Sequence, residues 1–143
     1  GTRLLSGGRD GTIRLWDLQA RAQQAVLRGH QGWVEAVTFA GSEAISASRD
    51  GTIRRWELGS GEVLAQMDHG AAVFGLAVSE DGGTIFAGGS DSSISVWTAG
   101  GESVGRMTGH SASINALALS SDDVHLVSAS DDATLLVWET PER

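Results

Sequence analysis

The 143-residue sequence contains no cysteine, no lysine and no tyrosine, and it has a single proline. Without cysteine, the chain forms neither a disulfide framework nor a thiolate metal site. A reducing compartment is compatible with this composition, and the cytoplasm is the expected location. Without lysine, a phosphate-binding loop of the GxxxxGK type is excluded. No apolar run approaches the roughly 18 residues of a membrane helix, and no charged-then-apolar leader opens the chain, so no membrane association is expected.

Positive charge is scarce and unevenly distributed. The chain has ten basic residues, all arginine, against 18 acidic ones, for a net charge of −8. Residues 1–66 carry eight arginines and seven acids, whereas residues 67–143 carry two arginines and eleven acids. Such a surface repels phosphate backbones, so nucleic acid is not an expected partner. The acidic half either favours a basic partner or is a solvated face that keeps the protein soluble.

One sequence pattern recurs four times along the chain. Its copies read GGRDGTIRLW, SASRDGTIRRW, AGGSDSSISVW and SASDDATLLVW. Each copy ends in a tryptophan that lies six residues after an aspartate, and the tryptophans are 40, 41 and 41 residues apart: Trp16, Trp56, Trp97 and Trp138. A histidine precedes each of the last three copies, at His30, His69 and His110. Internal repeats of this period indicate a repeat architecture.

The segments between these markers have the pattern of strands. Short runs rich in valine, isoleucine, leucine and threonine alternate with turn sequences such as Gly-Ser-Gly and Asp-Gly. Examples are residues 34–39, 43–47, 52–58 and 62–67. No 3.6-residue apolar stripe continues across the turns, so helices are not predicted. Four short strands for every 40 residues or so are typical of a propeller blade, and the whole chain is expected to contain 14 strands.

The period, the Gly-His pairs, the turn aspartates and the closing Trp-Asp or Trp-Glu pairs resemble the WD-repeat family over the whole chain. The resemblance implies an all-β fold, a β-propeller built from four-stranded antiparallel blades. It also implies one partial propeller domain over residues 1–143, with repeat units of roughly 1–18, 19–58, 59–99 and 100–140. About three and a half repeats make an incomplete ring. The remaining blades are expected from flanking sequence, another chain or a homo-oligomer.

The resemblance also assigns structural roles inside each blade. In the family, a histidine, a strand serine, a turn aspartate and a tryptophan form a hydrogen-bonded chain. Two such chains are expected here, and their members are His30, Ser46, Asp50 and Trp56, and His110, Ser128, Asp132 and Trp138. In the third copy Ala87 replaces the serine and Asp68 replaces the glycine before the histidine. The prediction is therefore that Ala87 breaks the third chain and that this blade is the weakest.

Histidine, serine and aspartate are also the members of a hydrolase triad. A catalytic triad occurs once, however, whereas this set recurs from blade to blade. The G-x-S-x-G motif that would expose a nucleophilic serine is absent as well. The acid pairs at 122–123 and 131–132 lack the D-x-D-x-D-G pattern of a calcium loop. No catalytic residue, cofactor site or metal site is predicted.

Propellers of this family usually bind partners where the connections between blades and the turns inside them emerge. The corresponding residues are Arg9, Gln31, Trp33, Arg49, Ser90, Ser111, Ser113 and Asp131. Trp33 lies outside the repeating tryptophan series, so the fold does not require an indole there. Together with Arg9 and Arg49, it is expected to clamp an acidic or phosphorylated peptide. The alternative is that Trp33 packs on its own hairpin while the arginines pair with Glu35 or with aspartates.

The leading hypothesis for function is a non-enzymatic scaffold or sensor module that binds a protein or peptide partner within a larger protein or complex. One alternative is an enzymatic propeller with its active site in the central channel. The strands expected to line that channel offer Glu35 and Asn115 and otherwise apolar or small residues, and one acid is not a catalytic pair. The other alternative is a self-assembling structural repeat that has no separate ligand.

Overall fold

A computed structural model describes residues 1–141, so the last two residues of the predicted 1–143 domain lie outside the described part. The described residues form fourteen strands and no helix: β1 (Arg3–Gly7), β2 (Thr12–Asp17), β3 (Ala22–Arg28), β4 (Val34–Ala40), β5 (Glu43–Ser48), β6 (Thr52–Glu57), β7 (Val63–Asp68), β8 (Val73–Val78), β9 (Thr84–Gly89), β10 (Ser93–Thr98), β11 (Ser103–Thr108), β12 (Ile114–Leu119), β13 (His125–Ser130) and β14 (Leu135–Glu139). The predicted strands are confirmed.

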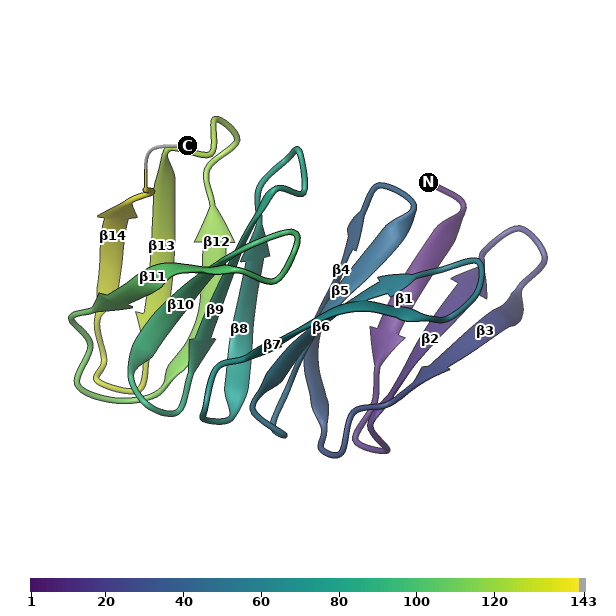
Figure 1. Cartoon of the computed structure of the whole chain (residues 1–143), viewed down its shortest axis with the longest axis horizontal. Helices are drawn as coiled ribbons and strands as arrows, with labels where there is room; N and C mark the ends of the chain where they lie inside the picture. The colour runs from purple at the N-terminus through teal and green to yellow at the C-terminus, as the bar shows by residue number, and fades with distance from the viewer. Residues whose placement is uncertain (142–143) are drawn as a thin grey trace.

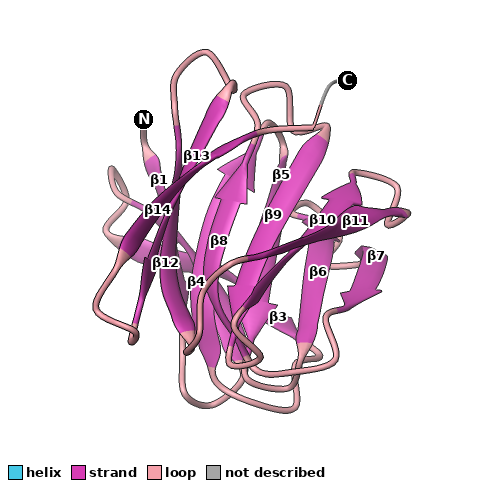
Figure 2. Ribbon diagram, turned by 90° about the vertical axis from the view of Figure 1, so that its left-hand side faces the viewer, coloured by secondary structure: helices cyan, strands magenta, loops and turns pink. Residues whose placement is uncertain are grey.

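The strands build four antiparallel sheets, each a meander of consecutive strands. Blade 1 is β1–β2–β3, blade 2 is β4–β5–β6–β7, blade 3 is β8–β9–β10–β11 and blade 4 is β12–β13–β14. Figure 1 shows them following one another from the N-terminal blade on the right to the C-terminal blade on the left. Figure 2 turns the left-hand side of Figure 1 toward the viewer, so that blade 4 lies in front of blade 3. The all-β propeller-blade fold is confirmed, and the four sheets of residues 1–141 do not close a ring.

Each blade has a tight turn at the recurring aspartate, which lies between β1 and β2, β5 and β6, β9 and β10, and β13 and β14. In blade 2 the Asp50 carboxylate accepts hydrogen bonds from the Thr52 backbone N–H (2.9 Å) and hydroxyl (2.7 Å). The residue after the aspartate has a positive φ in all four copies: Gly11 (76°), Gly51 (87°), Ser92 (68°) and Ala133 (67°). Glycine adopts this conformation without steric cost, whereas serine and alanine do not. The turns of blades 3 and 4 are therefore strained.

The core lies between the blades. Blades 1 and 2 enclose Ile13, Leu15 and Trp56, and the next two interfaces are formed around Ile45 and Ile85 and around Phe86 and Ile94. Because the inner blades are covered on both faces, their strands carry apolar residues on both sides. The Trp56 side chain is fully buried. Removing about 150–250 Å² of indole surface from water contributes on the order of 4–6 kcal/mol as an upper estimate.

The outward face of blade 4 is apolar and uncovered. Leu135 and Val137 of β14 are 69% and 68% exposed. Their equivalents in blade 3, Ile94 and Val96, are buried against blade 4 at 0% and 1%. Blade 4 therefore presents to solvent the same kind of surface on which the other blades stack.

Candidate partner-binding face

The connections β3–β4, β7–β8 and β11–β12 emerge at the same end of the molecule as the turns β1–β2, β5–β6, β9–β10 and β13–β14. This end is the lower edge of Figure 1, and we call it the loop face. All eight residues predicted to bind a partner lie in these connections and turns. The loop face combines a buried hydrogen-bonded framework with an exposed set of side chains above it.

In blade 2 the framework is a chain of four side chains. The His30 ring lies between the Asp50 carboxylate (Nδ1 to Oδ2, 2.8 Å) and the Ser46 hydroxyl (Nε2 to Oγ, 2.7 Å). The Trp56 indole N–H donates to the same hydroxyl at 2.8 Å. The network is satisfied when neutral His30 carries its proton on Nδ1 and Ser46 donates to Nε2. Burial lowers the pKa of His30 below its ordinary value, against the opposing effect of the Asp50 carboxylate, so a neutral ring is favoured.

Blade 4 repeats this geometry. His110 lies 2.8 Å from Asp132 and 2.7 Å from Ser128, and the Trp138 indole donates to Ser128 at 2.8 Å. Ser46 and Ser128 are both fully buried. Each hydroxyl is engaged by an indole and an imidazole and is closed to solvent. These residues hold the blade together and are not placed to attack a substrate.

Burial of Asp50 raises the pKa of its carboxyl group, but the hydrogen bonds that it accepts from Thr52, from the Gln31 backbone N–H and from His30 outweigh this effect. The pKa of Asp50 therefore lies well below its ordinary value. Hydrogen bonds from Thr134 place the pKa of Asp132 similarly low. Both turn carboxylates are negative at neutral pH.

The prediction that Ala87 breaks the chain in blade 3 is wrong. Ser95, which pairs with Ala87 across the sheet, supplies the hydroxyl instead. It lies 2.7 Å from Nδ1 of His69 and accepts the Trp97 indole N–H at 2.8 Å. The ring is turned relative to the other blades, so its Nε2 faces Asp91 at 2.9 Å. A hydroxyl on the neighbouring strand completes the same network because cross-strand partners lie side by side on one face of the sheet.

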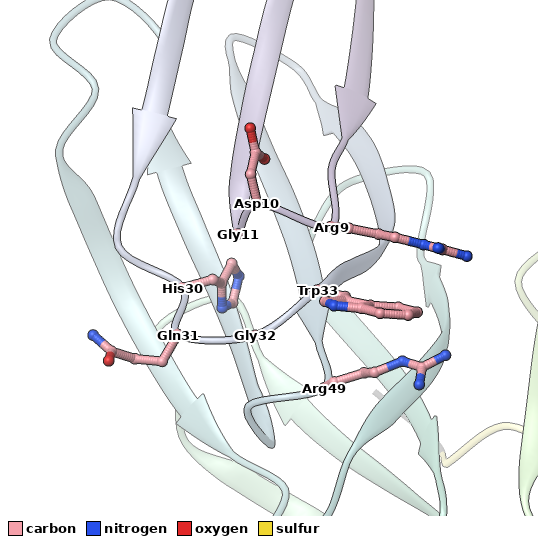
Figure 3. A pocket seen from close by; sticks show the side chains of 8 residues that line it. All are labelled: Arg9, Asp10, Gly11, His30, Gln31, Gly32, Trp33 and Arg49. Atoms are coloured by element: carbon pink, nitrogen blue, oxygen red, sulfur yellow. The ribbon is translucent and has the colours of Figure 1, made fainter.

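Above this framework, four side chains from three blades form one continuous stack. The guanidinium carbons of Arg9 and Arg49 each lie 4.2 Å from the centroid of the Trp33 ring. Figure 3 shows the two arginines on opposite faces of the indole, with all three side chains projecting in the same direction. Arg49 also lies over the Phe74 ring, 5.4 Å from its centroid. We call Arg9, Trp33, Arg49 and Phe74 the cation–π stack.

The two arginines differ in their charge partners. The Arg49 Nε–H donates to the Glu35 carboxylate, as the alternative interpretation of the sequence anticipated for the arginines. Within residues 1–141, the Arg9 guanidinium interacts with the Trp33 ring and with no carboxylate. A pocket of about 510 Å³ opens beside the stack, and its lining is Arg9, Asp10, Gly11, His30, Gln31, Gly32, Trp33 and Arg49. Arg9 therefore brings an uncompensated positive charge to this pocket.

The other predicted partner-binding residues lie away from the stack or bind through their backbone. Gln31 and Ser111 donate their backbone N–H groups to Asp50 and Asp132. Ser90 and Asp131 bond to the backbone carbonyls of Ala72 and Ser113. Asp131 also accepts a hydrogen bond from the Asn115 side chain, 2.5 Å long. The loop face thus runs from basic and aromatic on blades 1 and 2 to polar and acidic on blade 4.

Phe74 is the member of the stack that the sequence analysis missed. It directly follows Val73, as Glu35 follows Val34 and Asn115 follows Ile114, and these three positions are equivalent. The aromatic residue stands where the other repeats have an acid and an amide, and this difference could have indicated that Phe74 contacts the loop face.

The residues of interest for a metal centre or for an active site in the channel are the acids and histidines of the described part. Among the described residues, no group of three or more histidines, aspartates and glutamates is placed to hold a metal ion. Glu35 is occupied by Arg49. None of residues 1–141 belongs to a helix of the length and apolar character that crossing a bilayer requires.

Comparisons with known proteins agree with this architecture. The profile of the family described as "WD domain, G-beta repeat" matches residues 1–17, 21–57, 61–98 and 101–139. The structure is similar to the crystal structure of the computationally designed Ika4 protein, with a TM-score of 0.88 and 30% sequence identity over 99% of this chain and 87% of that chain. A comparison with curated protein sequences found no match. Because four repeat matches span most of its length, the chain belongs to the WD-repeat β-propeller family, whose repeats are generally protein-interaction scaffolds and typically not enzymes.

Proposed function

We propose that this chain is a scaffold or sensor module that binds a protein or peptide partner at the loop face of blades 1 and 2. The observation that carries the proposal is Trp33, a half-buried indole held between two exposed arginines beside an open pocket. Tryptophan and arginine are the residue types that most often dominate the binding energy of protein interfaces.

The fold does not require this indole. The positions equivalent to Trp33 are Ala72 and Ser113, and the connections that hold them have the same course. In contrast, Trp56, Trp97 and Trp138 each donate to a blade serine and pack inside the stack of blades. A side chain that the repeat does not need is available for recognition.

The stack is also ordered before a partner arrives. Each arginine is restrained by contact with an aromatic ring, and such contacts contribute about 0.5–1 kcal/mol at exposed sites. Immobilising a flexible side chain on binding costs about 0.5–1.5 kcal/mol, and this cost is smaller when the side chain is held in place beforehand.

The proposal is tested by selecting binders from a random peptide library on the immobilised protein. The selected peptides are then titrated against wild type, Trp33→Ala and Arg49→Ala. The chain offers a matched control at the other end of β4, where Arg3 lies 5.6 Å over the ring of Phe39. We expect at least a tenfold loss of affinity for the loop-face variants and none for Arg3→Ala and Phe39→Ala. Peptides that bind the Trp33→Ala and Arg49→Ala variants as tightly as wild type would contradict the proposal.

We further propose that another blade, from flanking sequence, another chain or a second copy, covers the outward face of blade 4. The exposed Leu135 and Val137 support this, because the equivalent side chains of blade 3 are buried. Light scattering on this chain is expected to show association that is lost on replacing both residues with glutamate. A monomer that melts cooperatively would contradict the proposal that another blade covers this face.

A further inference from the structure

The cation–π stack offers hydrogen-bond donors rather than an aromatic surface. Both faces of the Trp33 ring are already occupied by guanidinium groups, so no free face is left for a cationic ligand. What remains accessible is the outer edges of the guanidiniums, which carry N–H donors in a planar fork. Such edges bind carboxylates and phosphates.

The charges around the stack also favour an anion. Arg9 has no carboxylate partner within residues 1–141, and Arg49 has one, Glu35. Asp10 lines the same pocket, but its carboxylate is engaged by Thr12 and Arg14 and points away from the stack in Figure 3. The positive charge at this pocket that has no carboxylate partner among residues 1–141 is therefore that of Arg9, on a chain whose net charge is −8.

The distance between the two arginines distinguishes one kind of anion from another. Their guanidinium carbons lie on opposite faces of the indole, each 4.2 Å from its centroid, and are therefore about 8 Å apart. A single carboxylate or phosphoryl group could accept hydrogen bonds from both arginines only by lying between them, and the Trp33 ring fills that space. In an extended peptide, residues i and i+2 project on the same side and are about 6.5–7 Å apart. The side chains of two such residues reach both guanidiniums.

The rest of the loop face limits where such a peptide lies. Asp131 occupies on blade 4 the position that Arg9 and Arg49 occupy on blades 1 and 2, and blade 3 has the neutral Ser90 there. An acidic segment is repelled by Asp131 and attracted by Arg9. Its charged part is therefore confined to blades 1 and 2.

Building on the proposed function, we propose that the stack binds an extended acidic peptide segment in which two carboxylates are separated by one residue. One carboxylate pairs with the Arg9 guanidinium and the other with Arg49, and the intervening backbone crosses the edge of the Trp33 ring. The proposal concerns a pair of carboxylates and not a single phosphorylated residue.

Four fluorescein-labelled nonapeptides test this ligand class, all built on one alanine, glycine and serine background. The first carries glutamates at positions 4 and 6, the second at positions 4 and 5, the third a single phosphoserine at position 4, and the fourth lysines at positions 4 and 6. Binding is measured by fluorescence anisotropy at two salt concentrations. We expect the 4,6-glutamate peptide to bind at least tenfold more tightly than the other three, and more weakly as salt is raised.

The same titration with variants shows which groups bind the peptide. Arg9→Ala is expected to reduce affinity for the 4,6-glutamate peptide at least tenfold. Arg9→Lys retains the charge but not the planar fork and is expected to fall between wild type and Arg9→Ala. Arg3→Ala is the matched control and is expected to leave binding unchanged.

Several results would overturn the inference: equal affinity for the 4,5-glutamate peptide, tighter binding of the phosphoserine peptide, no binding of the 4,6-glutamate peptide, or no effect of Arg9→Ala. These outcomes are distinct from failure of the proposed function. If library peptides require Trp33 but contain no acidic pair, the loop face is a binding site and the ligand class is wrong. If library binding does not depend on Trp33 or Arg49, the site itself is wrong.

Discussion

Replacing Ser95 with alanine is expected to lower the free energy of unfolding, although the repeat pattern places the network serine at position 87 and not at 95. The Ser95 hydroxyl is the shared partner of the Trp97 indole N–H and His69 Nδ1, at 2.8 and 2.7 Å. Ser95 and His69 are 1% and 2% exposed, so water does not readily replace the lost hydroxyl. Leaving a buried polar group unsatisfied costs about 1–3 kcal/mol. Two such groups lead us to expect a loss of about 2–6 kcal/mol in the free energy of unfolding.

A second substitution distinguishes this mechanism from a general loss of packing. Ala87→Ser places a hydroxyl where blades 2 and 4 have Ser46 and Ser128. The double variant Ala87→Ser/Ser95→Ala is therefore expected to recover at least half of the lost stability. The assay is urea unfolding followed by tryptophan fluorescence, with the slope of the transition compared among variants. Ser95→Ala within about 0.5 kcal/mol of wild type, or a double variant no more stable than the single one, would refute the shared-hydroxyl network.

Three further predictions use the same unfolding assay. Ala133→Gly is expected to raise the free energy of unfolding by about 0.5–1 kcal/mol, because glycine relieves the positive φ of 67° in the β13–β14 turn. The control is Ala20→Gly, at a turn residue without a positive φ, which is expected to lower it. Stabilisation by both substitutions or by neither would contradict the assignment of strain. Trp56→Ala is expected to lower the free energy of unfolding by about 3–5 kcal/mol. Trp33→Ala, which removes an indole outside the core, is expected to lower it by less than about 1 kcal/mol. Equal losses would mean that Trp33 is structural. Stability is expected to fall as pH drops below about 6.5, since the pKa of His30 is lowered in the folded chain and the unfolded chain takes up the proton first. A second loss is expected below about pH 4, where the lowered pKa values of Asp50, Asp91 and Asp132 act in the same direction; a stability that rises on acidification contradicts both assignments.

Much of the architecture was predictable because it is local and repeated. The recurring Asp-Gly turns and short apolar runs predicted the strands, and the spacing of the tryptophans predicted the blades. The predicted chain from His30 to Trp56 joins residues at the same repeat positions as His110, Ser128, Asp132 and Trp138 of blade 4, so the same geometry forms in both blades. The prediction for blade 3 was wrong because the repeat pattern places the network serine on one strand. The network needs only a hydroxyl within reach of both rings, and Ser95 on the neighbouring strand supplies it.

The location of the loop face was predictable from the sequence, but the interactions of its arginines were not. Arg9, Trp33 and Arg49 were identified from the sequence as a group, yet the sequence left open whether the arginines pair with acids or flank the indole. The structure shows both outcomes, with Arg49 bound to Glu35 and Arg9 without a carboxylate partner among residues 1–141. Phe74 was not anticipated because it comes from blade 3.

The sequence by itself determined the strands, their turns and the number of blades, since hydrophobic pattern and turn chemistry act between residues close along the chain. Only the tertiary structure decided which hydroxyl completes blade 3, which arginine retains a free charge and that an aromatic ring of blade 3 lies against Arg49. Each of these depends on how neighbouring strands and neighbouring blades are placed side by side. Distances of a few ångströms between residues far apart in the chain decide such contacts, and no spacing along the sequence encodes them directly.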